Sequence, residues 1–60
     1  MYRIICDISG MVHEYAGEGR WVREGGLRFD TQVDAEARFA ADSGRINPRI
    51  RPSIRVESAT

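Results

Sequence analysis

The chain has 60 residues, nine acidic and nine basic, so its formal net charge is zero. This length supports one small domain, residues 1–60, with a thin margin of stability, and a balanced charge is atypical of a protein that binds nucleic acid over its whole surface. One cysteine, Cys6, and one histidine, His13, cannot make an internal disulfide or a four-ligand zinc site. We therefore expect stability to come from a compact core, from oligomerisation or from a partner.

Three strands are predicted in the first part of the chain. Residues Tyr2–Ile8 are rich in β-forming side chains. Ser9 and Gly10 then give a turn signal before a returning strand at 11–16. A third, short strand is predicted at 20–23, where Trp21 and Val22 lie between two glycine-containing breaks.

One helix is predicted next, at 33–43. Thr31 is a good N-cap, and Asp34 three residues later gives the pattern of a capping box. Gly44 predicts a left-handed stop at the other end. At 100° per residue, one narrow stripe is formed by small apolar side chains, which would let the helix lie close on a sheet: Val33, Ala37, Ala40 and Ala41.

The segment 45–57 alternates strictly between apolar and polar side chains. Extended chain places successive side chains on opposite faces, so this pattern predicts a last strand with an isoleucine face and an arginine face. Pro48 and Pro52 remove two backbone donors, so the strand should lie at an edge or be partly irregular. The sequence thus predicts an α+β fold: a three- to four-stranded antiparallel sheet with one helix packed on a face, in β-β-β-α-β order.

The arginine face of this tail is the strongest functional signal. Segment 45–57 has a balance of +3, against −3 for the first 44 residues. Alternate strand residues lie about 6.6 Å apart, close to the spacing of consecutive phosphates, so Arg49, Arg51 and Arg55 are predicted partner-binding residues. The alternative is a set of cross-strand ion pairs with acids such as Asp7 or Glu14.

The aromatic side chains allow two interpretations. Trp21 is the natural core anchor for an alanine-lined helix, and its loss should be severe. Tyr15, if it faces outward beside arginines, would make a recognition surface of the kind found at interface hot spots. Phe39 lies on the flank of the helix, where it either closes over the sheet or contacts a partner. We therefore add Tyr15 and Phe39 to the predicted partner-binding residues.

No catalytic, metal or cofactor site is predicted. His13 alternates with Met11 and Tyr15 and has no carboxylate at a spacing that would make a catalytic pair. Cys6 lies among isoleucines, which indicates a buried structural thiol. The chain has no apolar run of membrane-spanning length and no signal peptide, so we expect a cytoplasmic protein that does not contact membranes.

Residues 29–40 resemble the strand-to-helix junction of many short bacterial and phage proteins. In size and sheet-plus-helix layout the chain resembles phage- or prophage-encoded inhibitors, including anti-CRISPR proteins. That resemblance implies a protein that blocks a larger bacterial machine by covering a protein surface. The net charge of zero departs from the strongly acidic members that imitate DNA.

Two functions stay open at this point. The first is a non-catalytic protein-binding module whose partner is a larger bacterial protein or nucleoprotein complex with an acidic surface. The second is a small nucleic-acid-binding protein that uses the arginine-rich tail. A homodimer is a further alternative, and an enzyme is not expected.

Overall fold

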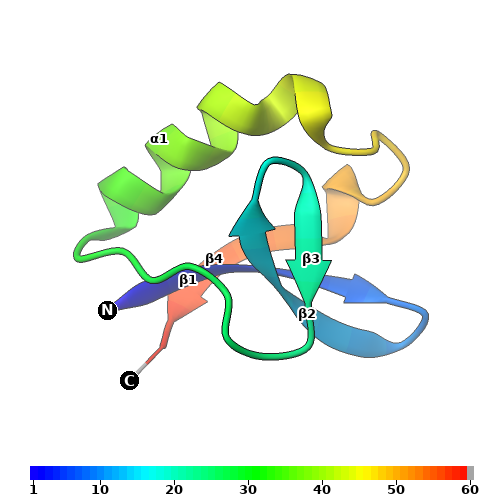
Figure 1. The fold of residues 1–60 in the computed structure, drawn as a ribbon, viewed down its shortest axis with the longest axis horizontal. Coiled ribbons are helices and arrows are strands. Elements are labelled where there is room, and N and C mark those ends of the chain that lie inside the picture. The colour runs from blue at the N-terminus through cyan, green and yellow to red at the C-terminus, as the bar shows by residue number, and fades with distance from the viewer. Residues whose placement is uncertain (60) are drawn as a thin grey trace.

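The computed structural model describes residues 1–59. Their order is β1 (Tyr2–Ile8), β2 (Met11–Gly17), β3 (Arg20–Val22), α1 (Gln32–Asp42), the 3₁₀ segments η1 (Ser43–Arg45) and η2 (Arg51–Ser53), and β4 (Ile54–Ser58) (Figure 1). The predicted α+β class and the β-β-β-α-β order are confirmed. No helix in the described part of the chain is long and apolar enough to span a membrane.

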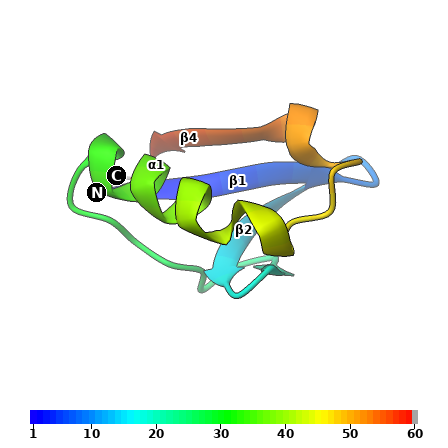
Figure 2. The same ribbon diagram turned by 90° about the horizontal axis from the view of Figure 1, so that it is seen from above.

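The four strands form one antiparallel sheet in the order β3-β2-β1-β4. Helix α1 lies across one face, which we call the helix face; the other is the open face (Figures 1 and 2). Ile4 belongs to the core cluster on the helix face, so alternation and register place Arg3 and Ile5 on the open face. By the same reasoning, Asp7 of β1 and three cross-strand neighbours also lie on the open face: Glu14, Arg55 and Glu57.

The β1–β2 hairpin closes with the predicted turn. Ser9 and Gly10 have φ values of 54° and 81°, and positive φ at both central residues is what a type I′ turn requires. Ile8 and Met11 pair across it, and the register then continues to Ile5 opposite Glu14.

Beyond that pair, β1 and β2 diverge, and residues 27–29 fill the gap. The Leu27 N–H donates to the Tyr15 carbonyl over 2.8 Å, and Phe29 exchanges two backbone hydrogen bonds with Tyr2. Gly26 makes this approach possible, because a Cβ there would lie 2.6 Å from the Glu14 Cβ. The segment between β3 and α1 is thus hydrogen-bonded to the sheet at Leu27 and Phe29.

The predicted N-terminus of the helix is confirmed. The Thr31 hydroxyl accepts a hydrogen bond from the Asp34 N–H over 3.1 Å, so Thr31 is the N-cap. The predicted glycine stop is wrong: α1 ends at Asp42, and Gly44 lies inside η1 without a positive φ. The helix therefore tightens into a 3₁₀ turn, a common helix ending.

The predicted packing stripe of the helix is also wrong. Val33 is 72% exposed, and Ala37, Ala40 and Ala41 are exposed as well. Ala35 is the buried residue of α1, and Phe39 packs beside it against the core. The helix is rotated by about half a turn from the expected orientation, because Ala35 and Phe39 bury more apolar surface than the alanine stripe.

The core on the helix face consists of Ile4, Tyr15, Ala35 and Ile46, with eight half-buried apolar side chains packed around it. Trp21 is one of these; it is half-buried, not mostly buried, and its ring lies 5.0 Å from that of Tyr15. The prediction that Trp21 packs on the alanine stripe fails with the stripe itself. Cys6 is buried, as predicted.

The predicted tail strand forms only in about its last third. Residues 43–53 contain η1, a turn and η2, and the strand begins at Ile54. Pro52 lies in the first turn of η2, where its fixed φ and missing N–H are well tolerated. The two predicted features that hold are the edge position of β4 and the irregular path around the prolines.

Candidate partner-binding surface

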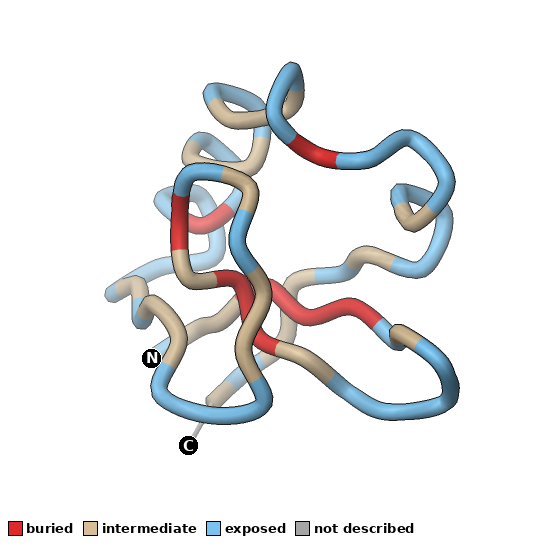
Figure 3. The backbone as a smooth tube through the Cα atoms, turned by 45° about the vertical axis from the view of Figure 1, so that its right-hand side comes forward, coloured by how far each residue is buried: buried red, intermediate tan, exposed pale blue. Residues whose placement is uncertain are grey.

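Residues 43–55 form a basic, mainly exposed region, which we call the arginine segment. It leads from the end of α1 to β4 and contains four arginines and no acid. All four are exposed: Arg45, Arg49, Arg51 and Arg55. Figure 3 shows the chain that follows α1 as mainly exposed, and Ile46 is the buried residue of the segment.

Apolar side chains and backbone contacts hold this segment on the core. Ile46 is 4% exposed, and Ile50 packs against the core cluster. The Cys6 thiol lies 3.6 Å from the Ile50 carbonyl oxygen, to which it donates. Gly19 lies so close to the segment that a Cβ there would be 2.6 Å from the Arg45 carbonyl oxygen. The backbone that carries the arginines is therefore fixed at several points.

The four guanidinium groups differ in their partners. Arg51 donates to the Ser43 carbonyl over 2.6 Å. Arg55 lies 3.6 Å from the Asp7 carboxylate, and both side chains are about half exposed. Among residues 1–59, the side chains of Arg45 and Arg49 make no hydrogen bond or ion pair; Arg49 contributes its backbone N–H to Asn47. Arg45 and Arg49 are thus the arginines of the segment that are free to bind a partner.

The structure changes the predicted geometry of these residues. Arg49 and Arg51 lie in a turn and in η2, and Arg55 lies on β4, so the three do not form one face of a strand with a repeat of about 6.6 Å. Arg45 was not among the predicted site residues, because the alternation made it only the first polar position of a strand. The proposed ion-pair alternative holds for Arg55, whose partner is Asp7.

Tyr15 and Phe39 do not belong to an exposed surface. Tyr15 is 0% exposed, so its predicted place on an outward aromatic face is wrong. Its register partner is Trp21 on the helix face, where burial of the ring contributes to the core. Phe39 is half-buried and packs against the core, which is the structural interpretation of the two considered for it.

The Tyr15 hydroxyl joins the β2–β3 turn to the end of α1. It donates to Asp42 Oδ2 over 2.5 Å and accepts from the Gly19 N–H over 2.8 Å. Arg38 also donates to Asp42, over 3.0 Å. The hydrogen bonds from Tyr15 and Arg38 lower the pKa of Asp42, and burial raises the pKa of Tyr15. This network fixes the turn that supports Arg45.

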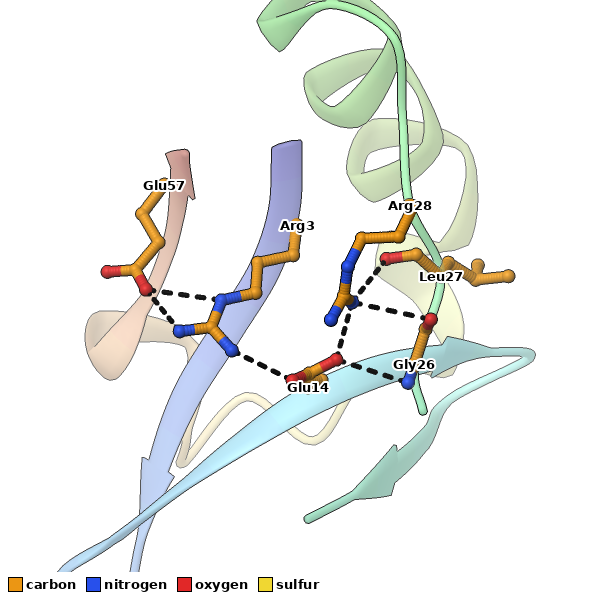
Figure 4. Close-up of polar contacts among 6 residues, drawn as sticks. All are labelled: Arg3, Glu14, Gly26, Leu27, Arg28 and Glu57. Carbon is orange, nitrogen blue, oxygen red and sulfur yellow. Dashed lines mark hydrogen bonds and ion pairs between the residues drawn. The ribbon is translucent and has the colours of Figure 1, made fainter. Parts of the chain in front are cut away.

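A second polar network covers the open face and centres on Glu14, which is 4% exposed (Figure 4). Glu14 pairs with Arg28 over 2.5 Å and with Arg3 over 2.8 Å, and it accepts from the Gly26 N–H. Arg3 also binds Glu57 over 2.5 Å. Hydrogen bonding by Arg28, opposed by desolvation, lowers the pKa of Glu14. Sequence reasoning named Glu14 as a candidate for a cross-strand ion pair with the tail arginines, but its partners are Arg3 and Arg28, because the strand register decides which residues meet.

Neither a metal-binding group of side chains nor a pocket is found in the described part of the chain. Within residues 1–59, no group of three histidine, cysteine or acidic side chains is placed to hold a metal ion, and no cavity is detected. His13 Nδ1 lies 3.0 Å from the Met11 carbonyl oxygen. The pKa of the Cys6 thiol is raised, and the largest cause is burial.

Comparison with protein families, curated proteins and solved structures yields no match.

Proposed function

We propose that the protein is a small, non-catalytic protein-binding module whose arginine segment binds an acidic surface of a larger protein or nucleoprotein complex. The observation that carries this proposal is a mainly exposed stretch with four exposed arginines and no acid. Guanidinium groups are suited to bidentate contact with carboxylates, and those of Arg45 and Arg49 have no partner among residues 1–59.

Anchoring of the segment supports the same proposal. Binding is weakened by the entropy lost when a loop becomes ordered. Here Ile46 is buried, Ile50 is packed on the core, and Gly19 fits against the Arg45 backbone. The backbone of the segment is therefore already ordered, and mainly side-chain freedom is lost on binding.

A protein partner is favoured over nucleic acid by two observations. The arginines do not follow the regular strand spacing that would match a row of phosphates. A platform for single strands also needs exposed aromatic rings for base stacking, and Tyr15 is buried. Nucleic-acid binding remains the alternative function, supported by the local positive charge alone.

The biological form of the proposal is inhibition. A module of this kind would block a larger bacterial machine by covering part of its surface, as the resemblance to phage-encoded inhibitors, including anti-CRISPR proteins, suggests. The support for this form is the resemblance of residues 29–40 and the size and layout of the chain. A cytoplasmic location belongs to the same proposal.

The test compares two double variants of equal charge change. Arg45→Gln with Arg49→Gln removes the two unpaired arginines, and Arg20→Gln with Arg23→Gln removes two exposed arginines near β3. Each protein is used to capture partners from a nuclease-treated bacterial lysate, followed by mass spectrometry. We expect specific acidic partners to be retained by wild type and by the β3 control and lost by the first variant.

The salt dependence of binding then separates the two functions. Binding to single-stranded nucleic acid weakens with a log-log slope of about −0.7 per phosphate contacted. If a thymidine oligomer binds with that slope, and the material captured from a lysate without nuclease treatment is lost on digestion with nuclease and not with protease, the alternative function stands. Equal capture by both double variants would contradict a role for the arginine segment in either function.

A further inference from the structure

Strand β4 is an edge strand with an unpaired outer side. In the sheet order it is the terminal strand next to β1, and no strand or bridge within residues 1–59 pairs with its other side. Figure 2 shows β4 as the outermost ribbon of the sheet beyond β1. Unpaired edges of this kind are templates for pairing with another strand.

Two backbone contacts establish which residues of β4 have backbone N–H and C=O groups that point outward, away from β1. Tyr2 exchanges hydrogen bonds with Phe29, on the side of β1 away from β4, whereas the Met1 carbonyl accepts from Ala59 on the β4 side. The backbone groups of the odd-numbered residues of β1 therefore bond to β4. Their partners are Arg55 and Glu57, whose backbone N–H and C=O groups point inward, toward β1. The N–H and C=O groups of Val56, between them, point outward.

The charges of β4 are complementary to a second copy of β4. If two β4 strands pair antiparallel with Val56 opposite Val56, each Arg55 lies opposite the Glu57 of the other copy. If the pairing is instead centred one residue away, Arg55 lies opposite Arg55 of the second copy, or Glu57 lies opposite Glu57. Opposite charges across neighbouring strands are stabilising and like charges are destabilising, so charge selects the Val56 register.

The open face carries the same alternation of charge up to the edge. Arg28, Glu14, Arg3 and Glu57 form a row of alternating sign within one copy, and Arg55 is followed by Asp7. The Val56 register places Arg55 of the second copy next in the row after Glu57. Both hydrogen bonds that Arg3 donates to Glu57 go to Oε1, and Glu57 Oε2 has no partner within residues 1–59.

We propose that the protein forms a two-fold symmetric dimer by antiparallel pairing of β4 with β4 of a second copy, centred on Val56. The two Val56 residues exchange two backbone hydrogen bonds, and two Arg55–Glu57 ion pairs form between copies on the open face. The result is a continuous eight-stranded sheet with one helix per copy. This interface shares Ile54 and Arg55 with the arginine segment, but the dimer does not rest on the proposed function of that segment.

The pairing of short strands predicts a weak dimer. β4 has five residues, and interfaces below about 1,200 Å² are typical of weak or transient association. Dimerisation should therefore be measured by sedimentation and by NMR over a concentration series that reaches the millimolar range. We expect the Val56 amide to shift with concentration and to gain protection from hydrogen exchange.

Charge exchange at the edge tests both the dimer and its register. Arg55→Glu alone and Glu57→Arg alone place like charges opposite each other twice, and each should weaken the dimer by about tenfold. An equimolar mixture of the two variants restores two opposite-charge pairs, so a heterodimer should form at least as tightly as wild type. Arg49→Glu, which changes charge outside β4, is the control and should leave dimerisation unchanged.

The folding of each variant is checked by circular dichroism, because both substitutions remove an ion pair within the copy. Synthesis of the chain with an N-methylated Val56 amide gives a second variant that keeps every side chain and blocks the outward donor. It should remain a monomer. A protein that stays monomeric throughout the concentration series overturns the dimer, and a mixture no tighter than the single variants overturns the Val56 register.

Discussion

The two faces of the sheet are built from the same three long strands but are stabilised differently. The helix face is covered by α1 and holds an apolar core around Ile4 and Tyr15. The open face has no covering element, yet Ile5 on it is 1% exposed. Its cross-strand neighbours are Glu14 and Arg55, and the apolar stems of long charged side chains can cover such a residue.

This comparison shows how a chain of this length uses both sides of a small sheet. One helix cannot cover two faces, and on the open face charged residues pair with each other beside the buried Ile5. The helix face should then depend on apolar volume, and the open face on charge. Substitutions on the two faces can separate these contributions.

The largest effect is expected for Tyr15→Ala on the helix face. Loss of a buried aromatic ring removes about 3–5 kcal/mol, which is close to the whole stability of a domain of this size. Urea denaturation provides the measurement. Tyr15→Phe keeps the ring and loses only the hydroxyl contacts with Asp42 and Gly19, so it should cost about 1–2 kcal/mol. Equal losses for the two variants would contradict the view that Tyr15 stabilises the fold mainly through burial of its apolar ring.

The next largest effect is expected for Glu14→Gln on the open face. The amide keeps the shape of the side chain but leaves Arg28 without a charged partner and Arg3 with Glu57 alone. We expect a loss of about 2–3 kcal/mol, since breaking one side of a buried ion pair is costly. Glu24→Gln, in an exposed position, is the matched control and should be neutral in the same denaturation experiment.

The two faces should also differ in their response to acid. The pKa of Glu14 is lowered in the folded state, so its contribution is complete above the ordinary glutamate pKa, about 4.3. That contribution is lost as the pH falls through the lower, folded pKa. The melting temperature should fall below about pH 4.3, and Glu14→Gln should flatten this decline. The lowered pKa of Asp42 should leave a residual slope; an unchanged slope in the variant would contradict the role of Glu14.

The smallest effect is expected for Arg55→Ala. Its ion pair with Asp7 spans 3.6 Å between half-exposed side chains, and exposed pairs contribute about 0–1 kcal/mol. Measured at a concentration where the protein is monomeric, stability should change by less than about 1 kcal/mol. A larger loss would show that the apolar stem of Arg55 is needed to cover Ile5. Arg55 would then contribute to stability about as much as Glu14.

The order of elements could be predicted from the sequence because its signals are local. The Ser9-Gly10 turn, the Thr31 cap and the β-forming run at Tyr2–Ile8 act over a few residues, and the structure contains all three. The packing of the helix could not be predicted in the same way. Alanines have little apolar surface, so the side of α1 that faces the sheet is decided by Phe39 and Ala35 in three dimensions.

The sequence predicted which residues make the candidate surface basic, but not the backbone conformation that carries them. The alternation at 45–57 counts Pro48 and Pro52 as apolar positions, although proline also constrains φ and removes a donor. These constraints lead to turns and η2 in place of a longer strand. The Glu14 network depends on the register of β1 against β2 and on the insertion of residues 27–29, and neither is encoded in a short window of sequence.

The position of β1 has a consequence for how the protein is made. This strand is flanked by β2, which follows it after a two-residue turn, and by β4, whose Glu57 is 54 residues from its partner Arg3. A β-hairpin closes in about 1–10 μs, whereas long-range pairing is slowed by loop closure. On the ribosome, the β1–β2 hairpin can therefore form early, but one side of β1 stays open to incorrect partners until β4 has been synthesised.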